Sequence, residues 1–150
     1  MAQNLLSGYR LIENIKTGET EYNTMETITP CILIVDDEET IRRSLVAYLE
    51  DEGFKIIATE SGEEGLKILS KETIDVVIVD IRLAGIDGTA FIEQAHQMLP
   101  HIVFLICTGS VEFKLPEGLK NIGIKNEHIF RKPVTDLSAL TEAIKNSLEE

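Results

Sequence analysis

The chain has 150 residues, a length that fits one compact domain with a buried core. Its formal net charge of −12 argues against direct binding to nucleic acid or to an anionic membrane surface, because both contacts depend on lysine and arginine. No apolar run approaches the roughly 20 residues that cross a bilayer, and the N-terminus lacks a basic-then-apolar signal pattern. We therefore expect a cytoplasmic protein.

Residues 1–29 differ from the rest of the chain, and we predict an N-terminal extension or linker there. Apolar residues between positions 5 and 15 recur with a rough helical spacing, which Gly8 interrupts. The alternative is a short hairpin that turns near Thr17-Gly18-Glu19. Residues 17–29 are rich in threonine and glutamate and weakly apolar, which is typical of a linker.

From residue 31 onward, short apolar runs alternate with segments of helical periodicity. Continuous apolar runs indicate strands that are covered on both faces, and they lie at 31–35, 54–59, 74–79, 102–107 and 127–131. Helices are predicted over 39–51, 61–70, 89–98 and 136–148. This alternation predicts residues 30–150 to be one α/β domain, with a parallel five-stranded sheet and helices on both faces.

Local signals support the helix ends. Gly53 can end the first helix, and Ser61 has the pattern of an N-cap for the second. Thr135 or Asp136 can cap the last helix. Residues 111–123 are expected to hold only a short or irregular helix, because they contain a proline and a glycine at 116 and 118.

The two cysteines, Cys31 and Cys107, lie in or beside predicted strands. Their separation does not match the paired spacing of a zinc site. We expect both to be reduced and buried in the core.

Polar residues collect where the predicted strands end. The first strand is followed by Asp36-Asp37-Glu38, the third by Asp80, the fourth by Thr108 and the fifth by Lys132. Because the carboxyl ends of parallel strands meet at one edge of the sheet, these side chains should lie together. Each of them alone is common in turns and caps, but their joint occurrence predicts a functional site.

The chemistry that suits this set is phosphoryl transfer. Asp36, Asp37 and Asp80 would repel one another unless a hard cation such as Mg²⁺ were bound between them. The carboxylate of Asp80 can then act as a nucleophile toward a phosphoryl donor. Lys132 offers a compact cation for a phosphoryl oxygen, and Thr108 offers a short hydroxyl that can move onto the phosphoryl group.

Residues 31–147 resemble the receiver domain of bacterial two-component response regulators. The matching text is Ile-Leu-Ile-Val-Asp36-Asp37-Glu38, Val-Val-Ile-Val-Asp80 through Gly88, Cys-Thr108-Gly109 and Arg-Lys132-Pro133-Val. The resemblance implies a flavodoxin-like fold with strand order 2-1-3-4-5. It also implies phosphoryl transfer from a histidine kinase or a phosphotransfer protein to Asp80.

Further expectations follow from the resemblance. Mg²⁺ would take one ligand from the backbone carbonyl of Arg82, and the Lys132–Pro133 peptide would be cis. The chain would catalyse only its own phosphorylation and dephosphorylation, and it would not otherwise be an enzyme. Its downstream partner, a protein or an output domain, is not identified by any motif, and a homodimer is left open.

Two departures from the family pattern favour an alternative function. The position three before Lys132, often aromatic in the family, is Ile129, with Phe130 next to it. The interrupted segment 111–123 replaces a helix through which the family commonly signals and dimerises. The alternative is a protein-binding module of the same fold that is insensitive to phosphate. A stand-alone phosphate ester hydrolase ranks third, since no second acid–base group is evident beside Asp80.

Overall fold

The structure is a computed structural model that describes residues 9–149. Its strands are β1 (Tyr9–Thr17), β2 (Thr20–Thr27), β3 (Cys31–Val35), β4 (Lys55–Thr59), β5 (Val76–Val79), β6 (Val103–Thr108) and β7 (Ile129–Arg131). Its helices are α1 (Glu39–Asp51), α2 (Gly62–Lys71), α3 (Gly88–Met98), α4 (Glu117–Asn121) and α5 (Leu137–Leu148), with a 3₁₀ turn η1 (Asn126–His128). Among these helices, none has the length and apolar content needed to span a bilayer.

The main sheet has five strands in the order β4-β3-β5-β6-β7, and all neighbouring pairs are parallel. Counted from β3, this is the predicted order 2-1-3-4-5, so the α/β prediction is confirmed. Every residue of β3 and β5 is buried. The central strands therefore need apolar side chains on both faces, which explains why their sequences are continuous apolar runs.

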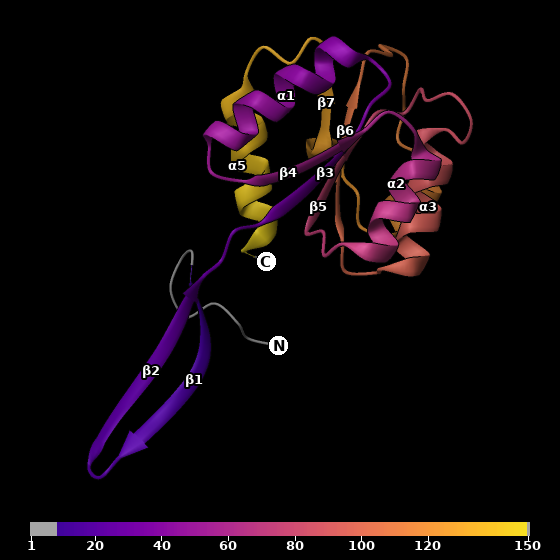
Figure 1. The fold of residues 1–150 in the computed structure, drawn as a ribbon. Helices are drawn as coiled ribbons and strands as arrows, with labels where there is room; N and C mark the ends of the chain where they lie inside the picture. Colours follow the sequence, from indigo (N-terminus) through magenta and orange to yellow (C-terminus); the bar gives the residue numbers. More distant parts are fainter. Residues whose placement is uncertain (1–8, 150) are drawn as a thin grey trace.

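Helices cover both faces of the sheet. In Figure 1, α1 and α5 lie on one side of the strands, and α2 and α3 lie on the other. Alternate residues of β3 enter separate cores: Leu33 and Val35 pack toward α2 and α3, whereas Ile32 and Ile34 pack toward α1 and α5. This sandwich holds the carboxyl ends of the strands at one exposed edge, where the polar residues lie.

The predicted helix ends are largely confirmed. Gly53 has a φ of +97°, the left-handed conformation that commonly follows a helix end. Ser61 Oγ accepts a hydrogen bond from Glu64 N at 3.2 Å, and Asp136 Oδ1 accepts one from Ala139 N at 3.1 Å. Asp136, rather than Thr135, is therefore the cap of α5.

Both cysteines are free and buried, as expected. Burial raises the pKa of both thiols, and it raises the pKa of Cys107 to about 12. Both thiols therefore stay protonated at neutral pH and act as core side chains.

In the last third of the chain, one predicted boundary was wrong and one expectation was confirmed. The fifth strand begins at Ile129 rather than at residue 127, because residues 126–128 form the turn η1. Within that turn, the Lys125 backbone N–H donates to His128 Nδ1 at 2.9 Å, which holds this segment out of the sheet. The segment 111–123 contains only α4, which has five residues, so the expectation of a short helix is confirmed.

The N-terminal segment forms a hairpin, which confirms the hairpin alternative, and residues 20–27, whose composition is typical of a linker, form its second strand. β1 and β2 pair in an antiparallel two-stranded sheet, and the Thr17–Thr20 pair closes the turn. Gly18 has a φ of +62°, and it occupies the first position of a two-residue turn, where glycine is favoured. The helical alternative is wrong for residues 9–15, and its first part, residues 5–8, lies outside the described residues.

Candidate functional site

Backbone hydrogen bonds between neighbouring strands continue one residue beyond the strand ends. They hold the first site residue that follows each of three strands in place. Asp36 N donates to Thr59 O at 3.1 Å, and Asp80 N donates to Val35 O at 3.0 Å. Lys132 N donates to Thr108 O at 2.8 Å. The predicted site residues are therefore held by sheet hydrogen bonds and are brought together as the strand ends predict.

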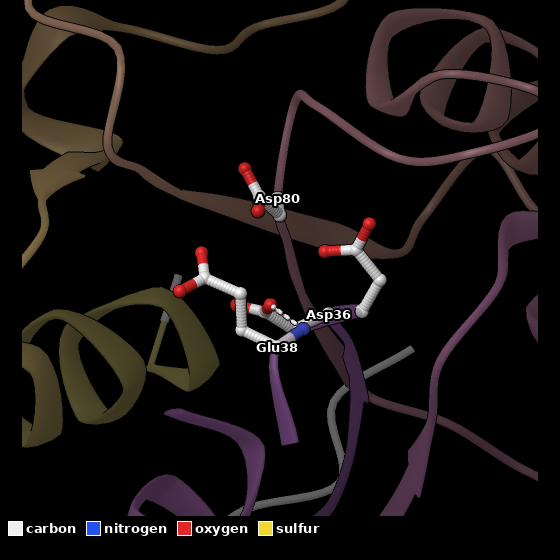
Figure 2. A group of neighbouring side chains, drawn as sticks. Asp36, Glu38 and Asp80 are labelled. Atoms are coloured by element: carbon white, nitrogen blue, oxygen red, sulfur yellow. Dashed lines mark hydrogen bonds between the residues drawn. The ribbon is translucent and has the colours of Figure 1, made fainter. Parts of the chain in front are cut away.

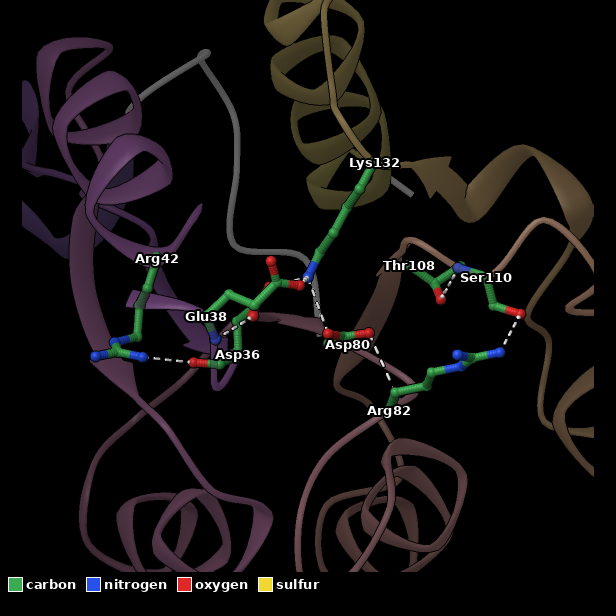
Figure 3. A network of polar contacts seen from close by, with 8 residues as sticks. All are labelled: Asp36, Glu38, Arg42, Asp80, Arg82, Thr108, Ser110 and Lys132. Carbon is green, nitrogen blue, oxygen red and sulfur yellow. Dashed lines mark hydrogen bonds and ion pairs between the residues drawn. The ribbon is translucent and has the colours of Figure 1, made fainter. Parts of the chain in front are cut away.

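Lys132 is the centre of the site. Its Nζ lies 2.8 Å from Asp36 Oδ2, 2.9 Å from Asp80 Oδ2 and 2.9 Å from Glu38 Oε1 (Figure 3). The side chains of Asp36, Asp80 and Lys132 are only 2%, 4% and 7% exposed, whereas that of Glu38 is 59% exposed. The lysine thus contacts two buried carboxylates from different strands and one carboxylate at the rim, and its single positive charge offsets only part of their negative charge.

The proton equilibria of the site follow from burial and these contacts. Burial by itself lowers the pKa of Lys132, but hydrogen bonds to Asp36, Asp80 and Glu38 outweigh burial and raise it. Burial raises the pKa of Asp36, although its contact with Lys132 and the Glu38 backbone N–H lower it in part. The buried carboxylate of Asp36 is therefore held in its charged form at a cost to folding.

The Asp36→Asn variant should be more stable than wild type, and the difference in unfolding free energy should grow as the pH rises. The folded pKa of Asp36 lies above its usual value of 3.8, so the folded chain binds this proton more tightly than the unfolded chain. The wild-type protein therefore loses folding stability as the pH rises above 3.8 and this carboxyl ionises. A protein with asparagine at this position has no such loss. We expect a gain of the order of 1 kcal/mol at neutral pH, measured by urea unfolding with a chelator present.

Asp51→Asn is the matched control, since Asp51 is an exposed residue at the end of α1. It changes the net charge equally but should show no such pH-dependent gain. A difference between Asp36→Asn and wild type that stays constant with pH would contradict the prediction.

Four carboxylates form a group that fits a hard divalent cation. One oxygen from each of Asp36, Asp37, Glu38 and Asp80 lies within 4.8 Å of the others. Figure 2 shows the Asp36, Glu38 and Asp80 side chains drawn together at the strand ends. Asp36 Oδ2 is buried, and Lys132 Nζ is in ion-pair contact with it at 2.8 Å. A set of ligands made only of carboxylate oxygens, whose negative charge exceeds that of one lysine, suits Mg²⁺.

The carboxylates are oriented by local backbone contacts. Asp36 Oδ1 accepts from Glu38 N at 2.9 Å, and Asp80 Oδ1 accepts from Arg82 N at 3.2 Å. Asp37 is exposed at the start of the following loop. In both Asp36 and Asp80, Oδ1 is fixed by a backbone N–H, and Oδ2 faces Lys132.

Several site contacts were not predicted from the sequence. Arg42, in the first turns of α1, donates to the Asp36 carbonyl at 2.7 Å. Arg82 Nη2 donates to Ser110 Oγ at 3.2 Å, and Thr108 Oγ1 accepts from Ser110 N at 3.2 Å (Figure 3). For Arg42, its position in the helix that directly follows Asp36 could have indicated the contact. For Ser110, no sequence pattern indicated one. Glu38 was noted as the third acid but was given no role.

The family is decided by comparison with known proteins. Residues 32–145 match the model of the response regulator receiver domain. The chain belongs to the response regulator receiver family. This receiver has the acidic pocket and the lysine of a phosphoacceptor receiver, and its cis Lys132–Pro133 peptide was predicted from the resemblance.

Relatives of this receiver occur in different protein contexts. Transcriptional regulatory protein GlrR of Escherichia coli is 31% identical over 119 residues, which cover 79% of this chain and 26% of that protein. Sporulation initiation phosphotransferase F of Bacillus subtilis is 30% identical over 117 residues, which cover 78% of this chain and 92% of that protein. The chain thus spans about a quarter of the first relative and most of the second.

Solved receiver structures superpose on this fold. A CheY-like receiver domain protein from Methanospirillum hungatei has a TM-score of 0.69 and 28% identity, and the match covers 81% of this chain and 98% of that one. Response regulator TrrA from Thermotoga maritima, in complex with Mg²⁺–BeF, has a TM-score of 0.68 and 27% identity, and covers 79% and 99%. The acidic cluster of this receiver is typical of a receiver Mg²⁺ site.

Proposed function

We propose that Asp80 accepts a phosphoryl group from the phosphohistidine of a histidine kinase or a phosphotransfer protein. The observation that carries this proposal is the 2.9 Å contact between Lys132 Nζ and Asp80 Oδ2 at a position where both side chains are nearly buried. A carboxylate held against a fixed cation is suited to bind and stabilise an incoming phosphoryl group.

The other side chains would have distinct roles. The Arg82 N–H keeps Asp80 Oδ1 in place, so that Oδ2 is the oxygen that forms the new bond to phosphorus. Lys132 would then pair with a phosphoryl oxygen, and the buried Thr108 hydroxyl would donate to another. Thr108 Oγ1 at present accepts from Ser110 N, so such a move would pull on the segment after β6.

We propose Mg²⁺ as the cofactor. Asp36, Asp37 and Asp80, with the backbone carbonyl of Arg82, would hold the ion, and it would supply the positive charge that lets an anionic donor approach.

The reaction is confined to the chain's own aspartate, in the cytoplasm. Residues 1–29 would be an extension of a receiver formed by residues 30–150, and the phosphate would alter contacts with a downstream protein or output domain.

The second candidate is a protein-binding module that does not respond to phosphate. Ile129 stands where the family often has an aromatic residue, and α4 has only five residues. In that case a BeF-loaded chain and an untreated chain would retain the same partner equally in a pull-down, whereas the first candidate requires a difference.

Incubation with acetyl phosphate and Mg²⁺ should add one phosphoryl group per chain, detected by intact-protein mass spectrometry. Asp80→Asn should abolish the adduct, because an amide cannot act as the nucleophile. Asp51→Asn, which removes an exposed carboxylate from α1, should leave the adduct unchanged. Lack of any adduct with acetyl phosphate and with kinase donors would refute the proposal, as would an adduct that persists in Asp80→Asn.

A further inference from the structure

Within residues 9–149, both outer edges of the N-terminal hairpin are unpaired. Within the described residues, β1 and β2 pair only with each other, and Figure 1 shows them extending away from the receiver body. A two-stranded hairpin is at best marginally stable in water, and three or more strands are usually needed. Neither strand contains proline, the residue that most directly blocks edge pairing. An additional strand would therefore stabilise this element.

Exposed apolar side chains favour β1 as the edge that is covered. The hairpin exposes four large apolar side chains, namely Tyr9 at 46%, Leu11 at 38%, Ile12 at 58% and Tyr22 at 55%. Three of the four belong to β1. Exposed apolar residues gathered on one strand mark an interaction surface better than single scattered residues do.

The charges on the two strands distinguish their possible partners. β2 carries Glu21 and Glu26 and has no lysine or arginine, so two copies of β2 would bring acids together. β1 carries Arg10, Glu13 and Lys16, so a second β1 can offer opposite charges. The signs on β1 make this strand complementary to itself.

A bulge in β1 puts the opposite charges on the same face. Arg10 pairs with Glu26 and Glu13 pairs with Thr24, and the register shifts between them. Thr24 and Glu26 are two residues apart and share a face of the hairpin, so Arg10 and Glu13 share it too. Without the bulge, two β1 residues three apart would point to opposite faces.

We propose that two copies of this chain associate through antiparallel pairing of β1 with β1, which forms a four-stranded sheet. The twofold axis passes between Leu11 and Ile12. Arg10 then lies opposite Glu13 of the partner subunit, and two-fold symmetry repeats this contact. Because both copies have the bulge, Leu11 and Ile12 of one copy face the same two residues of the other. The register is therefore the same on both sides of the bulge.

Other registers are unfavourable, because they place like charges opposite each other or pair residues that point to opposite faces of the sheet. Placing the axis at Glu13 would oppose Glu13 to itself and Arg10 to Lys16 of the partner subunit. Pairing Lys16 with Glu13 of the partner subunit would join residues on opposite faces, because their β2 partners, Glu21 and Thr24, are three apart. The Arg10–Glu13 register is therefore the one that joins unlike charges on one face.

This interface is separate from the site of Asp80 and does not require α4, through which relatives commonly dimerise. In this register residues 9–14 of β1 face the same residues of the partner subunit, so the interface is small and lies below the roughly 1,200 Å² that stable complexes bury. We therefore expect a reversible dimer with a dissociation constant of the order of 10 μM.

Sedimentation equilibrium of the 150-residue chain from about 1 μM to about 1 mM tests this dimer. The wild type should pass from monomer to dimer. Arg10→Glu and Glu13→Arg should each weaken self-association about tenfold, because each puts like charges opposite. Arg10→Glu also breaks the exposed ion pair with Glu26, so loss of association in this variant alone could reflect a weakened hairpin.

Mixing the two variants separates these causes. A chain with Arg10→Glu and a chain with Glu13→Arg restore opposite charges at both contacts, so their mixture should form a heterodimer that is about tenfold tighter than the homodimer of either variant. Glu19→Arg, the same charge change as Glu13→Arg at an exposed residue of the turn between β1 and β2, should leave the dimer unchanged. A wild type that stays monomeric, a mixture that associates no more tightly than either variant alone, or a dimer lost in Glu19→Arg would each overturn the proposal.

Discussion

Lys132→Met should destabilise the receiver by about 3 to 5 kcal/mol at neutral pH in the presence of a chelator. Asp36 and Asp80 are nearly buried, and Lys132 is the cation that contacts both of them. Without it, two buried carboxylates would face each other uncompensated, which is the costly way to break a buried ion pair. Such a loss is a large part of the 5 to 15 kcal/mol that typically stabilises a domain.

Urea unfolding of wild type and variant measures this difference. Added Mg²⁺ should recover part of the loss, because the freed carboxylates become better ligands. Phosphorylation by acetyl phosphate should also fall by about 100-fold or more, since a cation for the phosphoryl oxygens is lost.

The control is Lys120→Met, which removes a lysine that makes an exposed 3.7 Å ion pair with Glu117. Exposed pairs contribute little, so this variant should lose less than about 1 kcal/mol. Equal unfolding midpoints for Lys132→Met and wild type in chelator would show that the buried contacts do not carry the expected energy.

Gly88→Ala should destabilise the fold by about 3 kcal/mol and disturb the loop that carries Asp80. A Cβ at Gly88 would lie 2.2 Å from the Asp80 carbonyl oxygen and 2.6 Å from Ile81 Cα. Both are backbone atoms of one segment, and Gly88 N also donates to Ile81 O at 2.8 Å. The loop cannot yield without moving the proposed phosphoacceptor, so phosphorylation should fall as well.

Gly118→Ala is the matched control on α4. The nearest atom to an added Cβ there is Glu93 Oε2, at 4.0 Å. Alanine fits this helix and should stabilise it by about 0.5 to 1 kcal/mol. Thermal unfolding of both variants compares the same replacement with and without a backbone clash, and a Gly88→Ala protein as stable as Gly118→Ala would contradict the prediction.

The fold and most of the site were predictable from the amino-acid sequence. The central strands are buried on both faces, so their apolar runs are unbroken and easily found. Parallel strands end at one edge, which is why Asp36, Asp80 and Lys132 could be placed together without coordinates. Short-range signals also worked at Ser61, whose hydroxyl caps a helix only three residues away.

Predictions failed where local preference was weak or where the deciding contacts are distant in the sequence. Threonine and glutamate in residues 20–27 suit a linker or a strand, and pairing with β1 decides between them. Likewise, no local pattern shows that Glu38 reaches Lys132, 94 positions away.

The sequence alone thus determined the parallel α/β sheet and the identity of the carboxylates, hydroxyl and lysine at its edge, because these depend on apolar periodicity and on residues that immediately follow strands. The strand order was implied by the resemblance to receiver domains. Only the tertiary structure decided that Lys132 joins three carboxylates, that Arg82 and Thr108 both contact Ser110, and that residues 9–27 form a hairpin. Those contacts depend on side-chain direction and strand pairing, which one-dimensional patterns do not specify.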